Sequence, residues 1–151
     1  MNLDAANKSL EAQLDVDPDE PLVLIWNAER QERVGGVVVD VVPLNNAVPL
    51  SGILPLVLVP GPIDGTQKIK VTSIRGHNGN DYDVKVWLIE NIGGTRYPYC
   101  CIKLSPGDNL IDVSDGDCKV LDACGNLKVI NGTCAAGDPG YFTDNAFVIE
   151  T

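Results

Sequence analysis

Five cysteines and one histidine are the residues of this sequence with the widest chemical range, as metal ligands, nucleophiles or redox groups. The cysteines stand at 100, 101, 118, 124 and 134, and none of them forms the C-x2-C pair of a structural zinc site. Neighbours on a strand point to opposite faces, so Cys100 and Cys101 are poorly placed to bind one ion together. We therefore expect buried, reduced thiols, no metal and no cofactor, with a disulfide such as Cys118 to Cys134 as the alternative.

A catalytic pair would have to use His77, which stands in the turn-like segment "GHNGND". A Cys-His pair would require this loop to fold back onto the far end of a cysteine-bearing strand. The acidic run "DVDPDE" resembles a calcium loop, but Glu20 stands where that loop needs glycine. We expect no catalytic residues and no metal site, and we interpret the acidic run as a solvated segment.

Composition narrows the range of partners. The 151 residues fit one domain, and 21 acidic against 11 basic residues give a net charge of −10. Such a charge repels phosphate backbones and anionic membranes, which argues against nucleic acid or membrane as a partner. The first residues have no apolar core of signal-peptide length, and prolines interrupt the longer apolar runs, so we expect a protein made and kept in a cytoplasm.

Three regions differ in composition. Residues 1–21 are an acidic leader in which Leu3, Leu10 and Leu14 have near-helical spacing before the breaker "DVDPDEP". We interpret this leader as a short helix or an extended N-terminal arm that lies on a partner. Residues 22–65 hold the apolar runs "PLVLIW", "VGGVVVDVVPL" and "SGILPLVLVPGP", which are cut by proline and glycine. This pattern is typical of edge strands, bulges and arms.

The apolar surface of the first two regions predicts an interface between subunits. Residues 34–62 carry more valine and leucine than one small domain is expected to cover from within. We expect a homo-oligomer, most simply a trimer. Its predicted interface residues are Leu3, Leu10, Leu14, Val38, Val42, Leu54, Leu56 and Leu58.

Residues 66–151 show strand periodicity. In "YDVKVWLIE", Val84, Val86 and Leu88 alternate with Lys85, Trp87 and Ile89. The segment "TQKIKVTSI" alternates similarly, and the loop "RGHNGND" between the two predicts a hairpin. Further short strands follow at "YPYCCIKL", "NLIDV", "CKVLDACGNLKV" and "NAFVIE", separated by "NIGGTR" and "SPGD". The series predicts an all-β fold, an antiparallel β-sandwich.

The order of these segments, "IKVTSIRGHNGNDYDVKVWLIENIGGTRYPYCCIKLSPGDNLIDV", resembles small jelly-roll-like β-sandwich proteins of tailed-bacteriophage virions. The typical segment of these proteins has an N-x-(S/G)-x-x-D loop, a V-x-V-W-L strand, a glycine turn and a Pro-Gly-x-x-L turn. The resemblance covers roughly the last 85 residues. It implies a virion structural protein, most simply a capsid decoration or cement protein assembled in the host bacterial cytoplasm.

The resemblance also implies the partners. They would be further copies of the chain and the major capsid protein or other virion proteins. Two alternatives remain at this point: a neck or tail component, and a jelly-roll module that binds carbohydrate or a receptor. For the last of these, Trp87 and Tyr97 are the residues that would stack on a ligand.

Overall fold

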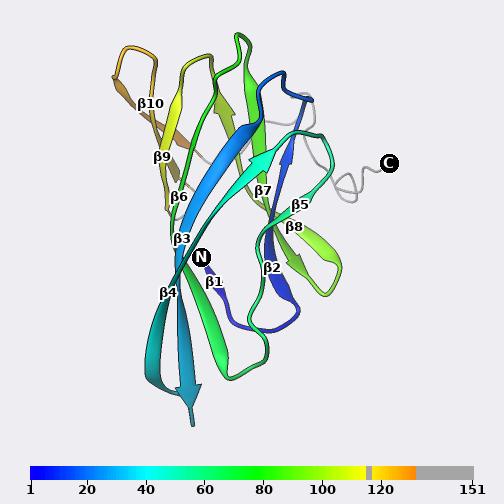
Figure 1. Ribbon diagram of the computed structural model, residues 1–151, viewed down its shortest axis with the longest axis vertical. Coiled ribbons are helices and arrows are strands. Elements are labelled where there is room, and N and C mark those ends of the chain that lie inside the picture. The colour runs from blue at the N-terminus through cyan, green and yellow to red at the C-terminus, as the bar shows by residue number, and fades with distance from the viewer. Residues whose placement is uncertain (115–116, 132–151) are drawn as a thin grey trace.

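The computed structural model describes residues 1–114 and 117–131, and these residues form two antiparallel sheets that pack face to face (Figure 1). The predicted antiparallel β-sandwich is therefore confirmed. In the described ranges, no helix is long and apolar enough to cross a membrane.

The larger sheet has seven strands in the described part of the chain. Their order is β11-β10-β9-β6-β3-β4, and β1 pairs with β6 beside this path. The strands are β1 (Asn2–Leu3), β3 (Leu22–Val34), β4 (Val37–Leu50), β6 (Gln67–His77), β9 (Asn109–Ser114), β10 (Asp117–Leu121) and β11 (Leu127–Asn131).

Among the described residues, the smaller sheet has four strands in the order β5-β2-β7-β8. They are β2 (Lys8–Leu14), β5 (Leu56–Val59), β7 (Val84–Ile92) and β8 (Thr95–Leu104). Strands β7 and β8 form a hairpin around Gly93 and Gly94, whose φ angles of 61° and 92° suit a two-residue turn. The glycine turn expected from "NIGGTR" is thus present.

The core lies between the sheets, where every second side chain of each strand points inward. Leu24 and Trp26 of β3 face Val86 and Leu88 of β7 within one buried cluster. Burying a side chain of this size stabilises the fold by about 1.5–3 kcal/mol. The same cluster includes Leu3 of β1, so all three compositional regions contribute to a single core.

The N-terminal segment differs from the expected leader or arm. Strand β2 pairs with both β5 and β7, and β1 pairs with β6. Leu10, Ala12 and Leu14 alternate with Glu11 and Gln13, which is the period of a strand. The near-helical spacing of the leucines misled the prediction because a pairing partner on each side decides the conformation here.

The predicted hairpin between residues 66–74 and 82–90 is also wrong. Strand β6 belongs to the larger sheet and pairs with β3 and β9, whereas β7 belongs to the smaller sheet and pairs with β2 and β8. The connecting loop therefore crosses from one sheet to the other. A loop rich in glycine and asparagine permits both kinds of connection, and the polar contacts described below select the crossing.

Candidate interaction surface

The β3–β4 hairpin is the longest element of the molecule and projects beyond the rest of the sandwich at the bottom of Figure 1. Its strands have 13 and 14 residues, whereas β2 of the smaller sheet has 7. Gly35 and Gly36 close the hairpin with φ angles of 59° and 82°, the two positive values that a type I′ turn requires. These two glycines therefore form a tight turn between β3 and β4.

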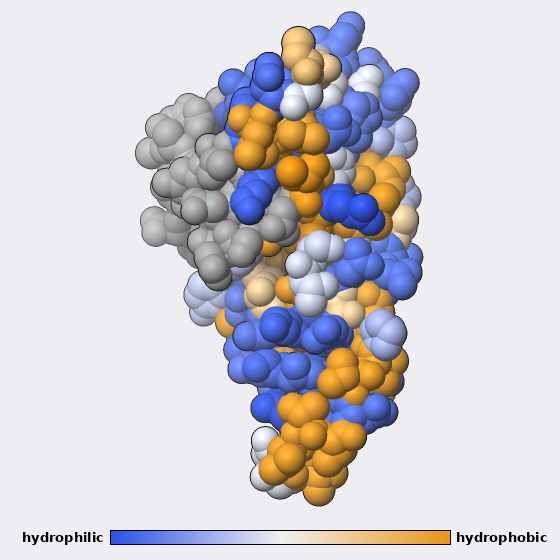
Figure 2. All heavy atoms as spheres, turned by 90° about the vertical axis from the view of Figure 1, so that its left-hand side faces the viewer, coloured by the Kyte–Doolittle hydropathy of each residue, from blue (hydrophilic) through white to orange (hydrophobic). Residues whose placement is uncertain are grey.

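Valines cover the end of this hairpin. Their exposed fractions lie between 45% and 69%, and we call the group the hairpin tip: Val34, Val37, Val38, Val39 and Val41. Figure 2 shows hydrophobic residues gathered at the lower end of the molecule, where the hairpin ends. Apolar side chains clustered in this way are typical of protein interaction sites.

The free edge of β4 is closed to main-chain pairing. In an antiparallel strand, alternate residues direct their N–H groups toward the same side, and Pro43 and Pro49 have no N–H to offer there. The N–H of Val41 donates to Asp40 Oδ1 and that of Ala47 donates to Asn46 Oδ1, each at 2.9 Å. The missing and engaged N–H groups disfavour pairing of this edge with another strand. We therefore expect a partner to contact the hairpin through side chains.

A second exposed apolar group lies just before and within β5. Its members are 44% to 60% exposed, and we call it the loop patch: Ile53, Leu54, Leu56 and Val57. Gln13 Nε2 donates to the carbonyl of Ile53 at 2.8 Å and ties this segment to β2. This hydrogen bond anchors the segment that carries the loop patch to the smaller sheet at one point.

A groove lies on the outer face of the larger sheet, at the end opposite the hairpin tip. We call it the sheet groove; its volume is about 520 Å³. Apolar lining comes from Val23, Ile25, Ile111 and Leu121, and the polar lining includes Arg75 and His77. Sequence reasoning missed this site, although the alternation in "PLVLIW", with Val23 and Ile25 facing outward, was a signal for it.

A buried polar network holds the crossing between β6 and β7. Asn78 is fully buried, and its side-chain amide donates to the carbonyls of Tyr82 and Leu104, each at 2.9 Å. Its Oδ1 accepts from the backbone and side chain of Asn80. Asn80 in turn exchanges hydrogen bonds with the backbone of Glu20. The Asn-Gly loop noted in the sequence is therefore a fixed corner of the fold.

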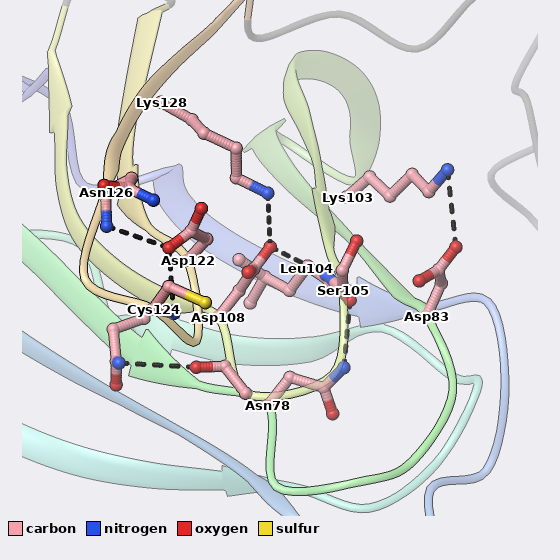
Figure 3. A network of polar contacts seen from close by, with 12 residues as sticks. Asn78, Asp83, Lys103, Leu104, Ser105, Asp108, Asp122, Cys124, Asn126 and Lys128 are labelled. Carbon is pink, nitrogen blue, oxygen red and sulfur yellow. Dashed lines mark hydrogen bonds and ion pairs between the residues drawn. The ribbon is translucent and has the colours of Figure 1, made fainter.

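The "SPGD" turn belongs to the same corner (Figure 3). Asp108 is 1% exposed; its Oδ2 accepts from the N–H of Ser105 and lies 2.9 Å from Lys128 Nζ. Nearby, the backbone N–H of Asn126 donates to Asp122 and holds the pKa of this carboxyl below its ordinary value. These carboxylates are engaged in holding turns together.

The predicted interface residues fall into two groups. Leu3, Leu10, Leu14 and Leu58 are at most 1% exposed and belong to the core, so their assignment to a subunit interface is corrected. These leucines lie within β1, β2 and β5, strands of the two packed sheets, and their side chains belong to the core between the sheets. Val38, Leu54 and Leu56 are exposed, and Val42 is half-buried.

The two aromatic residues considered for ligand stacking differ in their exposure. Trp87 is 3% exposed and packs with Ile89 and Cys101 in a second small cluster, so it has no free face for ligand stacking. Tyr97 is 51% exposed. Because strand alternation places Trp87 away from the main core, the sequence pattern alone left its burial open.

The cysteines and the histidine do not form a catalytic group among the described side chains. His77 Nδ1 lies 2.8 Å from Asn109 Oδ1 at the sheet groove, whereas Cys100 is a buried thiol of the smaller sheet. Cys101 is disulfide-bonded, which corrects the expectation of five reduced thiols. Across the described ranges, no group of three or more His, Cys, Asp or Glu residues is placed to hold a metal ion.

Comparisons of the chain with protein-family models, with curated proteins and with solved structures found no match.

Proposed function

We propose that this chain is a structural protein of a tailed-phage virion, a capsid decoration or cement protein that acts by docking. Two features support the proposal. The chain has the β-sandwich fold that the resemblance implies, and its Asn-Gly loop and Pro-Gly turn form corners of that sandwich. Its partners are the major capsid protein or other virion proteins, and its place is the virion.

The observation that carries the proposal is the pair of exposed apolar surfaces, the hairpin tip and the loop patch, on a chain of net charge −10. The charge keeps the free protein soluble and away from nucleic acid. The apolar side chains offer binding energy of about 25 cal/mol per Å² that a partner covers. A docking protein needs both properties, because it must stay soluble before assembly and bind afterwards.

Within this proposal, the loop patch meets the shell. The Gln13 contact restrains this segment at Ile53, which lowers the entropic cost of docking. The side chains at its centre are Leu54 and Leu56, with exposed fractions of 60% and 44%.

Co-sedimentation with phage heads that lack the protein tests the proposal. We expect the wild-type chain to pellet with heads and the Leu54→Asp/Leu56→Asp variant to lose this binding while keeping its fold. The matched control is Leu127→Asp, an exposed leucine outside the patch, which should bind as the wild type does. Pelleting with tails instead of heads would favour a neck or tail component, and pelleting with neither would refute the proposal.

A further inference from the structure

We infer that copies of this chain associate head to tail, with the hairpin tip of one copy seated in the sheet groove of the next. The inference rests on the proposed role in assembly, but it concerns contacts between copies of this chain and not the contact with the shell. Both halves of the contact, an apolar projection and an apolar recess, are present on every copy.

The positions of the two halves exclude an internal contact. Strand β3 carries Ile25 of the groove near its start and Val34 of the tip at its end. A rise of about 3.3 Å per residue separates these two residues by about 30 Å, and the extended strand between them does not fold back. A tip can therefore reach only the groove of another copy.

The surface between tip and groove makes the two sites distinct. On the outer face of the larger sheet, Glu29 pairs with Lys70 and Gln31 pairs with Lys68 across β3 and β6. Figure 2 shows a hydrophilic band between the hydrophobic lower end and a second hydrophobic group in the upper half of the face it presents. A partner that covers one apolar site therefore does not cover the other.

The volume of the groove suits the tip, and one charged group on each surface has the opposite sign. A groove of about 520 Å³ falls within the range of about 300–1,000 Å³ typical of ligand pockets, which is room for several valine side chains. Asp40 is exposed at the tip, and its Oδ1 accepts from the N–H of Val41, which leaves Oδ2 to meet a cation. The groove supplies the exposed guanidinium of Arg75, which would meet Asp40, and also the exposed carboxylate of Glu20, which Asp40 would have to avoid.

The blocked edge of β4 decides how the copies join. Because Pro43 and Pro49 prevent strand addition, the contact uses side chains and joins two different surfaces. Such a heterologous contact produces a closed ring if the rotation between copies closes, and an open chain otherwise. A trimer, as expected from the sequence, would be the smallest such ring with more than two members.

Complementation between two variants tests the inference. The tip variant is Val37→Lys/Val39→Lys and the groove variant is Val23→Lys/Ile25→Lys; all four side chains are at least 39% exposed, so the monomer should fold. Sedimentation velocity without phage heads measures the mass of each variant alone and of the mixture. The control Leu54→Lys should associate as the wild type does.

We expect each variant alone to lose self-association by about tenfold or more, and the mixture to form a dimer and nothing larger. The dimer forms because an intact tip on one variant meets an intact groove on the other. If a lysine variant does not fold, threonine at the same positions gives a second pair of variants. Threonine is β-branched like valine and isoleucine and changes the shape of the side chain less.

A tip variant that is monomeric beside a groove variant that associates as the wild type does would overturn the inference in favour of tip-to-tip contact. A mixture that stays monomeric would also overturn it. The outcome is separable from the proposed function: a wild-type chain that binds heads as a monomer refutes only the head-to-tail contact, and one that self-associates without binding heads refutes only the proposed function.

Discussion

Strand β2 and the hairpin tip are both apolar strand segments, yet the first is buried and the second is exposed. Leu10, Ala12 and Leu14 of β2 are at most 1% exposed, whereas Val37 and Val39 of β4 are 64% and 59% exposed. Local propensity favours a strand in both places. The difference is that the larger sheet faces β2, whereas the tip extends past the strands that would face it.

Strand length explains this difference. At about 3.3 Å per residue, the 14 residues of β4 span about 46 Å and the 7 residues of β2 about 23 Å. The smaller sheet therefore covers only part of the β3–β4 hairpin. Apolar residues in the covered part stabilise the fold, and those beyond it are available for binding.

The largest expected effect comes from placing a charge on a covered and on an uncovered side chain of one strand, β5. Leu58→Asp puts a carboxylate where the side chain is 1% exposed and should cost about 4 kcal/mol or more, enough to unfold a marginal domain. Leu56→Asp, two residues earlier and 44% exposed, should change the free energy of unfolding by about 1 kcal/mol or less. Urea denaturation measures both, and equal losses would contradict the division.

A smaller loss is expected at the buried corner. Asn78→Ala removes the donor to Tyr82 and Leu104 and should lower the free energy of unfolding by about 2–4 kcal/mol, because buried polar groups lose their partner. Asn45→Ala, on the exposed outer face of β4, is the matched control and should stay within about 0.5 kcal/mol. Equal denaturation midpoints for the two variants would show that the buried hydrogen bonds of Asn78 do not stabilise the fold.

Two glycines with similar backbone angles give the next comparison. Gly107 has a φ of 80°, and a Cβ added there would lie 2.8 Å from the Cβ of Ala123. Gly36 has a φ of 82°, but a Cβ added there would meet no atom within 4 Å. We expect Gly107→Ala to cost about 2–3 kcal/mol and Gly36→Ala about 1 kcal/mol. Thermal melts report the difference. A larger loss at Gly36 would mean that the hairpin tip is part of the stable core.

The smallest effect on stability should come from the tip itself. Val37→Thr/Val39→Thr keeps the β-branched shape and replaces exposed methyl groups, so the free energy of unfolding should change by about 0.5 kcal/mol or less. Self-association should nevertheless weaken several-fold, as sedimentation can measure. A clear loss of stability together with unchanged self-association would show that the hairpin tip is not part of the contact between copies.

Much of the fold was predictable because strand periodicity is a local signal. The alternation of Val84, Val86 and Leu88 with Lys85 and Trp87 gave β7 its two faces correctly. Its neighbours were not predictable in the same way, since the buried contacts of Asn78 that carry the chain from one sheet to the other join residues far apart in sequence. The β6–β7 hairpin was wrong for this reason.

The interaction surface was predictable only in part. The apolar runs indicated an interface, and Val38, Leu54 and Leu56 are exposed as that interface requires. Leu58 lies in one of the same runs and is buried, although alternation alone would place it on the same face as the exposed Leu56. A shift in the register between β2 and β5 falls at this point of the strand and breaks the alternation. The sheet groove needed the structure, since its lining comes from segments as distant as Ile25 and Leu121.

Sedimentation velocity of the wild-type chain over a range of micromolar concentrations tests most directly the claim that the hairpin tip of one copy binds the sheet groove of the next. The account predicts a mass that rises with concentration above the 16.1 kDa of one chain, and beyond that of a dimer, because each copy has a tip and a groove. A mass of 16.1 kDa at every concentration would contradict it.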